Sequence, residues 1–167
     1  MNRKRAVCLG LFLAAVTAAD QITKALVRAN IPYGDTVALL PGVVQLRHVR
    51  NPGAAFSMLG GFRWFFLALV LVFFVGVGIL IKKKVLRRPA ELWALAAIGG
   101  GALGNAIDRA LCGEVTDMID PLFIDFAVFN VADCFITCGA VFLAVYVVFF
   151  DRSKEHKQEE GRGKKEA

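Results

Sequence analysis

DCFITCGAVFLAVYVVFF, residues 133–150, is an apolar run that begins with a carboxylate. An aspartate at a membrane boundary is costly to desolvate, so its presence there indicates a functional role. With the three residues before it, the run reaches the roughly 20 residues that a helix needs to cross the hydrocarbon core of a bilayer. A second aspartate, Asp117, lies in the short segment that leads into this run. We therefore expect a membrane-spanning helix with two carboxylates near one of its ends.

The composition of the whole chain indicates an integral membrane protein. Of its 167 residues, 57% are hydrophobic, and the mean hydropathy is +0.58; soluble domains have about 45–50% apolar residues. The length predicts one compact unit. The net charge of +6 comes from Lys and Arg at the ends of apolar runs. There is no basic stripe with interleaved aromatic residues, which argues against binding of nucleic acid.

The apolar residues gather into four predicted spans, over residues 6–27, 64–81, 90–111 and 130–150. The uninterrupted apolar part of the first ends at Ala19, so this span has to continue through Asp20 and Lys24. Residues 1–19 also resemble a cleavable signal peptide, with a basic start, an apolar core and small residues at the end. The helix-like continuation after Asp20 favours a span that is retained.

The fold expected from this pattern is a mainly α membrane protein, with four transmembrane helices and a small extracytoplasmic β-sheet between helices one and two. The sheet is expected in the external residues 30–61, where residues 37–40 and 43–49 are typical of short strands. Lys and Arg gather before the first span, between the second and third, and after the fourth. The positive-inside rule therefore predicts that both termini are cytoplasmic.

The chain is predicted to divide into one catalytic membrane domain and a tail. Residues 1–151 would form the integral-membrane domain. Residues 152–167 are charged and contain almost nothing apolar, so we expect a disordered cytoplasmic tail.

Separate stretches of the sequence deliver polar groups to the same depth in the membrane. With a helical rise of about 1.5 Å per residue, Asp20 lies about 21 Å across the membrane and Asp108 about 27 Å across. Asp133 begins the fourth span, which runs inward, and Asp117 lies in the external connection before it. The topology therefore predicts one polar site at the outer surface. Its further members would be Lys24, Asn105 and Arg109.

Several of these residues also have structural explanations, which the sequence leaves open. Asp20 and Lys24 are four residues apart and can pair on one face of a helix. Asp108 and Arg109 can anchor a helix end, and Asn105 can hydrogen-bond across helices. The glycine-rich stretch 99–104 favours close packing of helices over a ligand-binding loop.

Two carboxylates brought together are sufficient for hydrolysis of an amide. Like charges at short range cannot both ionise easily, so one carboxyl keeps a proton near neutral pH while its partner accepts one from water. Asp120 and Asp125 lie near Asp117 and leave open which carboxylate reacts. The two histidines and four cysteines show neither an HExxH nor a CxxC pattern, so we expect no metal, no other cofactor and no disulfide framework.

Five motifs follow one another from the first span to the fourth. They are Asp20-Gln21-Ile22-Thr23-Lys24, Asn51-Pro52-Gly53-Ala54-Ala55-Phe56, Gly100-Gly101-Ala102-Leu103-Gly104-Asn105-Ala106-Ile107-Asp108-Arg109, Val115-Thr116-Asp117 and Phe129-Asn130-Val131-Ala132-Asp133. Together they resemble the bacterial lipoprotein signal peptidase (signal peptidase II) family of membrane aspartic proteases. Each motif alone is weak evidence, but five in the same order are a strong signal. Met118 and Cys134 depart from the family pattern, in which Phe and Ser are common.

The resemblance implies an aspartic endopeptidase in which Asp117 and Asp133 are the catalytic pair. The residues that it implies as substrate-binding or site-shaping are Asp20, Lys24, Asn51, Gly53, Asn105, Asp108, Arg109 and Asn130. The implied substrate is a prolipoprotein whose cysteine carries diacylglycerol, cut just before that cysteine. The implied partners are membrane lipid and a globomycin-type inhibitor. The implied location is the bacterial inner membrane, with the site on its extracytoplasmic face, and we expect a monomer.

Two other classes of function compete with this interpretation. A small proton- or ion-coupled transporter is the second choice, because carboxylates with a nearby Lys are common in proton relays. The polar groups gather at one surface and not along a route across the membrane, which argues against it. A membrane assembly factor that uses glycine-rich packing would not explain two convergent aspartates.

Overall fold

The computed structural model describes residues 2–53 and 61–163 of the chain. Residue 1, residues 54–60 and residues 164–167 lie outside the described part. The second motif is therefore described only to Gly53, and nothing is said of Ala54, Ala55 and Phe56. The side chains of residues 150–163 are also not described.

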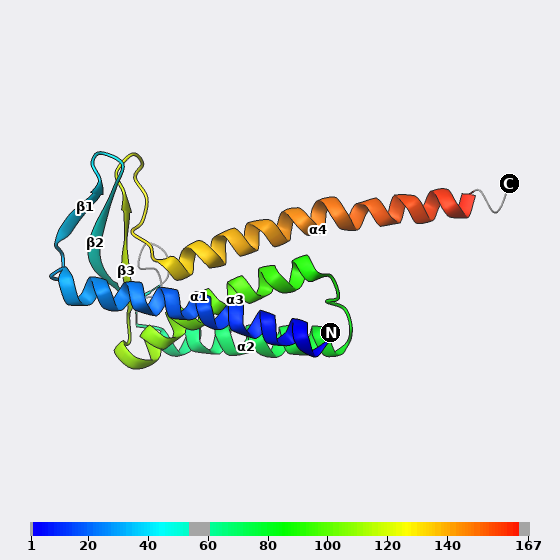
Figure 1. Ribbon diagram of the computed structural model, residues 1–167, viewed down its shortest axis with the longest axis horizontal. Coiled ribbons are helices and arrows are strands. Elements are labelled where there is room, and N and C mark those ends of the chain that lie inside the picture. Colours follow the sequence, from blue (N-terminus) through cyan, green and yellow to red (C-terminus); the bar gives the residue numbers. More distant parts are fainter. Residues whose placement is uncertain (1, 54–60, 164–167) are drawn as a thin grey trace.

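Four helices form the body of the molecule (Figure 1). They are α1 (Arg3–Asn30), α2 (Arg63–Lys82), α3 (Pro89–Cys112) and α4 (Val131–Gly163). Each is long and apolar enough to cross a membrane, which confirms the four predicted spans. α3 is central, because α1, α2 and α4 all pack against it. α1 runs without a break through Asp20 and Lys24, as the continuation of the first apolar run predicted.

The fourth helix is longer than the predicted span. α4 continues to Gly163, so the first part of the charged segment predicted to be disordered is helical in the structure. Low hydrophobicity predicted disorder for this segment, but its Lys, Arg, Glu and Gln residues are also good helix formers. The division into a membrane domain and a cytoplasmic tail stays a prediction.

A three-stranded antiparallel sheet lies at one end of the helices, and the start of α1 and the end of α4 lie toward the other end (Figure 1). Its strands, in the spatial order β1-β2-β3, are β1 (Thr36–Leu40), β2 (Val44–Asn51) and β3 (Val115–Pro121). The first two were predicted as short strands, over residues 37–40 and 43–49 of the external segment after the first span. β3 was expected only as a connection, so the sheet is not confined to the segment between helices one and two. Asp117 and Asp120 disfavour a strand by intrinsic propensity, and pairing with β2 overrides that preference.

Glycines of α3 allow the neighbouring helices to approach its backbone. A Cβ at Gly100 would lie 2.8 Å from the Leu13 carbonyl oxygen, and one at Gly101 would lie 2.5 Å from the Ala132 carbonyl oxygen. A Cβ at Gly104 would collide with the Asp20 carboxylate. The glycine-rich stretch therefore serves close helix packing, on the α1 side and on the α4 side.

Replacing Gly100 by Ala should destabilise the bundle by about 1–3 kcal/mol, the usual range for overpacking. The added methyl would press on the Leu13 carbonyl and on the Val16 side chain, both of which belong to α1. Thermal unfolding in detergent would measure the change. Gly76→Ala is the matched control, because a Cβ at that helical glycine meets nothing within 4 Å. Equal stability of the two variants would contradict this account of the packing.

Candidate active site

A backbone bridge brings Asp117 and Asp133 to the same place. After β3 the chain loops out and returns, and Phe129 pairs with Ile119 in an antiparallel bridge. The Ile119 amide donates to the Phe129 carbonyl at 2.7 Å, and the Phe129 amide donates back at 3.1 Å. α4 begins two residues later. Asn130 is thereby placed against Asp117 just before the helix that carries Asp133.

Asn130 contacts both aspartates. Its side-chain amide donates to Asp117 Oδ1 at 2.6 Å. Its backbone amide donates to Asp133 Oδ2 at 3.1 Å, and its Oδ1 accepts from the Asp133 backbone amide at 3.0 Å. The last two bonds form a reciprocal cap at the start of α4. Asp133 thus belongs to the helix cap, where the helix dipole favours a negative charge.

Two further asparagines hold the outer sides of the pair. The Asn51 amide, at the end of β2, donates to Asp117 Oδ2 at 2.9 Å. The Asn105 amide, on α3, donates to Asp133 Oδ1 at 2.8 Å. Each of the four carboxylate oxygens thus accepts one hydrogen bond from an asparagine. Neutral amides from three separate elements orient the carboxylates, and among the described residues each oxygen keeps a lone pair for substrate or water.

The two aspartates line a common cavity of about 230 Å³. The residues that line it are Asn51, Phe66, Asn105, Arg109, Val115, Asp117, Val128, Asn130 and Asp133. Asp117 is only 3% exposed. The volume is large enough for water together with part of a peptide, because one water in the liquid occupies about 30 Å³.

Burial raises the pKa of the Asp117 carboxyl to about 6, and the neighbouring Asp133 carboxylate adds to the rise. Hydrogen bonds from Asn51 and Asn130 and the charge of Lys24 act in the opposite direction. A carboxyl with a pKa in this range can hold or release a proton close to neutral pH.

A buried ionic cluster lies behind the cavity. Lys24 Nζ lies 2.8 Å from Asp20 Oδ2 and 3.3 Å from Asp108 Oδ2, and it donates to Asn105 Oδ1 at 2.8 Å. Lys24 and Asp20 are completely buried. Lys24 therefore holds the asparagine that in turn holds Asp133. The structure contains the pairing of Asp20 with Lys24 that the sequence allowed. Lys24 also pairs with a third residue, Asp108 on α3.

Asp20 also caps α4 from a distant part of the chain. Its Oδ1 accepts from the Ala132 backbone amide at 2.9 Å. Next to it, the Gln21 amide donates to the Gly104 carbonyl at 3.0 Å and to Asp108 Oδ1 at 3.1 Å. These bonds connect α1, α3 and the start of α4 inside the bundle.

Asp108 positions the third strand. Its Oδ2 accepts from the Thr116 backbone amide at 3.0 Å. Arg28 Nη1 donates to the Thr116 hydroxyl at 2.9 Å and lies 3.5 Å from Asp108 Oδ1. Asp117 follows Thr116 directly. The hydrogen bond between Thr116 and Asp108 therefore fixes the distance of Asp117 from α3.

Arg109 closes another side of the cavity. Its Nη2 donates to the Gly53 carbonyl, and its guanidinium lies 4.4 Å from the centre of the Phe66 ring. Its Nε is buried and has no hydrogen-bond partner among the described residues. Arg109 thus connects the turn after β2 with α2 and α3.

The structure brings together all the site residues that the sequence predicted. They are Asp20, Lys24, Asn51, Gly53, Asn105, Asp108, Arg109, Asn130, Asp117 and Asp133. The two competing carboxylates lie elsewhere: Asp120 accepts from Gln45 Nε2 at 2.7 Å on the sheet, and Asp125 is exposed.

Sequence reasoning missed several neighbours of the site. Gln21 and Thr116 stood inside the quoted motifs, and a polar residue next to Asp20 was a usable signal. Phe66 gave no such signal in the sequence, because it is one of many aromatic residues in an apolar span.

Comparisons with known proteins place the chain in a family. The family model described as signal peptidase (SPase) II matches residues 12–149. The chain belongs to the signal peptidase II family. The match covers most of the chain, from the first helix to the last. Family membership makes it a protease and a bacterial multi-pass membrane protein.

Individual relatives cover nearly the same part of the chain. A lipoprotein signal peptidase of Brevibacillus brevis is 40% identical over 86% of this chain and 96% of its own length. One of Streptococcus pyogenes is 36% identical over 86% of this chain and 93% of its own. A solved bacterial membrane enzyme has a TM-score of 0.80 at 29% identity and covers 89% of this chain and 90% of its own. A second has a TM-score of 0.77 at 30% identity, with 85% and 93% covered.

Lys24→Met should lower the free energy of unfolding by about 3–5 kcal/mol, because it leaves the buried Asp20 without its cation and Asp108 with only the more exposed Arg28. Arg50→Met is the control, since Arg50 is half exposed in its ion pair with Glu114 and such a pair contributes about 0–1 kcal/mol. Thermal denaturation of both variants in detergent would measure the difference. A mild effect of Lys24→Met would mean that the cluster does not hold the helices together.

Proposed function

We propose that this protein is an aspartic endopeptidase that removes the signal peptide from diacylglyceryl-modified prolipoproteins and cuts just before the lipidated cysteine. Asp117 and Asp133 are the catalytic pair. The observation that carries the proposal is the single asparagine, Asn130, that hydrogen-bonds to both carboxylates at the wall of one cavity. The signal peptidase II family and the curated relatives named lipoprotein signal peptidase support the choice of substrate.

The proposed reaction uses one proton shared by the two aspartates. The ionised carboxylate takes a proton from water, whose oxygen attacks the scissile carbonyl carbon. The protonated carboxyl donates to the carbonyl oxygen, giving a tetrahedral diol. When the C–N bond breaks, the amine of the cysteine takes up a proton from one aspartate, and a diol hydroxyl returns a proton to the other, so the pair again holds one proton. The products are the signal peptide with a free carboxylate and the lipoprotein with a free amino-terminal cysteine.

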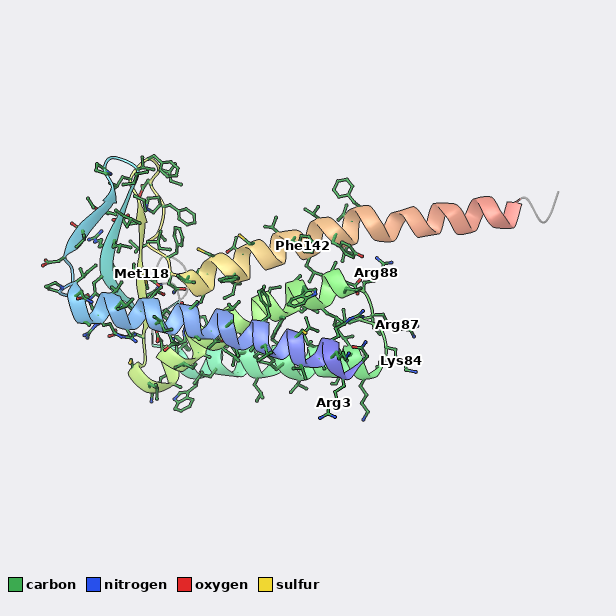
Figure 2. The ribbon with its side chains drawn as sticks, in the orientation of Figure 1. Arg3, Lys84, Arg87, Arg88, Met118 and Phe142 are labelled. Carbon is green, nitrogen blue, oxygen red and sulfur yellow. The ribbon has the colours of Figure 1, made fainter. Side chains whose placement is uncertain are left out.

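The surroundings of the pair suit a substrate that lies in lipid. An apolar cavity of about 370 Å³ lies between α2, α3 and α4 and shares Phe66, Asn105 and Arg109 with the site. A peptide in the membrane could therefore reach the carboxylates without crossing bulk water. The sheet marks the site's end of the molecule, and labelled basic side chains such as Arg3 and Arg87 lie at the opposite end (Figure 2). This distribution supports cytoplasmic termini and a site on the extracytoplasmic face.

Asp117→Asn and Asp133→Asn should each lower the cleavage rate by at least about 10²–10⁴-fold, the usual contribution of an acid or base in hydrolysis. The measurement is cleavage of a diacylglyceryl-modified precursor by the purified protein in micelles. Asp120→Asn and Asp125→Asn are the matched controls, because the same change falls outside the cavity. A severe loss in a control, with Asp117→Asn still active, would overturn the choice of the pair.

Cleavage should fall as the pH rises above about 6, because Asp117 then loses the proton that the pair needs as its acid. The Asn51 hydrogen bond favours the ionised form of Asp117. Asn51→Ala should therefore raise the pKa of Asp117 and move the alkaline limb of the pH–rate profile to higher pH. Gln45→Ala, which removes a hydrogen bond to Asp120 on the same sheet, should leave the limb in place. A shift to lower pH in Asn51→Ala would contradict the assignment.

A further inference from the structure

A basic cavity lies at the end of the bundle opposite the sheet. It has a volume of about 290 Å³ and is lined by Arg5, Ile81, Lys84, Leu86, Arg87 and Leu92. Figure 2 shows Lys84 and Arg87 at this end, far from Met118 on β3. Three cations from two separate stretches of sequence therefore converge on one hollow that the proposed protease reaction does not use.

The cations of this cavity have no acidic partner among the described residues. The ion pairs of the described residues do not include Arg5, Lys84 or Arg87. The nearest acidic side chain on α3, that of Glu91, accepts from the Arg88 backbone amide at 3.2 Å and lies 3.9 Å from Arg88 Nε. An anionic ligand would therefore meet positive charge that the described residues leave uncompensated.

Lys84 has a backbone conformation that is energetically unfavourable for a residue other than glycine. Lys84 adopts φ 58°, the left-handed conformation that favours glycine, and it is the only non-glycine residue of the described chain that does so. The Val85 amide donates to the Leu80 carbonyl at 2.9 Å and the Lys84 amide donates to that of Ile81 at 3.0 Å, which closes the end of α2. Glycine would serve this cap better, so the presence of lysine points to a use for its side chain.

An apolar groove continues from the basic cavity into the membrane-spanning part. The groove has a volume of about 280 Å³ and shares Ile81 and Leu92 with the basic cavity. Its other lining residues are Leu9, Gly10, Leu13, Phe73, Phe74, Val77, Gly78, Leu95 and Ala96. Cβ atoms at Gly10 and Gly78 would meet nothing within 4 Å, so the groove has open space at both glycines.

We propose that the basic cavity and the groove together bind one anionic phospholipid, with its phosphate on Arg5, Lys84 and Arg87 and an acyl chain along the groove between α1 and α2. Cations at the end of membrane helices that open onto an apolar groove match the two parts of such a lipid. A soluble anion would use only the cations, and a neutral lipid would use only the groove. The ligand is thus a second lipidic molecule, bound away from the protease site.

The test compares phosphatidylglycerol with phosphatidylcholine of the same acyl chains, titrated onto the purified full chain in neutral detergent and counted by native mass spectrometry. We expect one tightly bound phosphatidylglycerol and weaker phosphatidylcholine. The triple variant Arg5→Gln, Lys84→Gly, Arg87→Gln should lower the affinity for phosphatidylglycerol about tenfold or more. Its Lys84→Gly change relieves the positive φ, so the fold should persist at that position.

Two matched controls separate a built site from general attraction. Arg3→Gln, Lys82→Gln, Lys83→Gln removes the same charge from the same end but outside the cavity, and should keep the affinity within about twofold. Gly78→Leu should block the groove, whereas Gly76→Leu, also at an open glycine of α2, should not. Equal losses in both triple variants, equal effects of the two glycine changes, or displacement of the lipid by inorganic phosphate alone would each overturn the proposal.

Discussion

The Lys24 ammonium lies between two carboxylates inside a membrane protein, and the positions of the other functional groups depend on that contact. Two buried anions without a cation would be far too costly in this surrounding. α1 and α3 must therefore stay close enough for Asp20, Lys24 and Asp108 to meet. Gly104 permits this distance, because any larger residue would collide with Asp20. From the cluster, Asp20 reaches the first turn of α4 and Asp108 reaches β3.

The ionic cluster and the aspartate pair are separated by amides, which has a chemical consequence. Lys24 acts on Asp133 through Asn105, and Asn130 lies between the two aspartates. A cation bound directly to a carboxylate would hold it ionised over the whole neutral range. Neutral donors orient the oxygens, and burial keeps the pKa of Asp117 at about 6 although the asparagine hydrogen bonds lower it. The cluster thus supplies rigidity, and the asparagines transmit it as uncharged groups.

The sequence predicted the helices and the convergence of the site because both follow from one-dimensional patterns. Apolar runs define the spans, and helical rise alone places Asp20 and Asp108 at similar depths. The third strand could not be predicted in this way, because Asp117 and Asp120 obscure its alternation and its partner, β2, lies far away in sequence. The role of Asn130 depends on the bridge between Ile119 and Phe129, a tertiary contact without a local signal. α4 is longer than the predicted span, because a charged sequence such as its C-terminal part is compatible with both helix and disorder.

The polar network also explains why α2 differs from the other helices. α1, α3 and α4 are joined by buried hydrogen bonds and ion pairs, whereas α2 has no buried residue among those described and packs against α3. Apolar contacts in lipid give little net attraction, because lipid tails are as apolar as the side chains that they replace. The stacking of Arg109 on Phe66 is the contact that connects α2 to the site. Both apolar cavities border this helix. The helix that is least bound by polar contacts is therefore the one that borders both the cavity proposed for substrate entry and the groove proposed for a phospholipid.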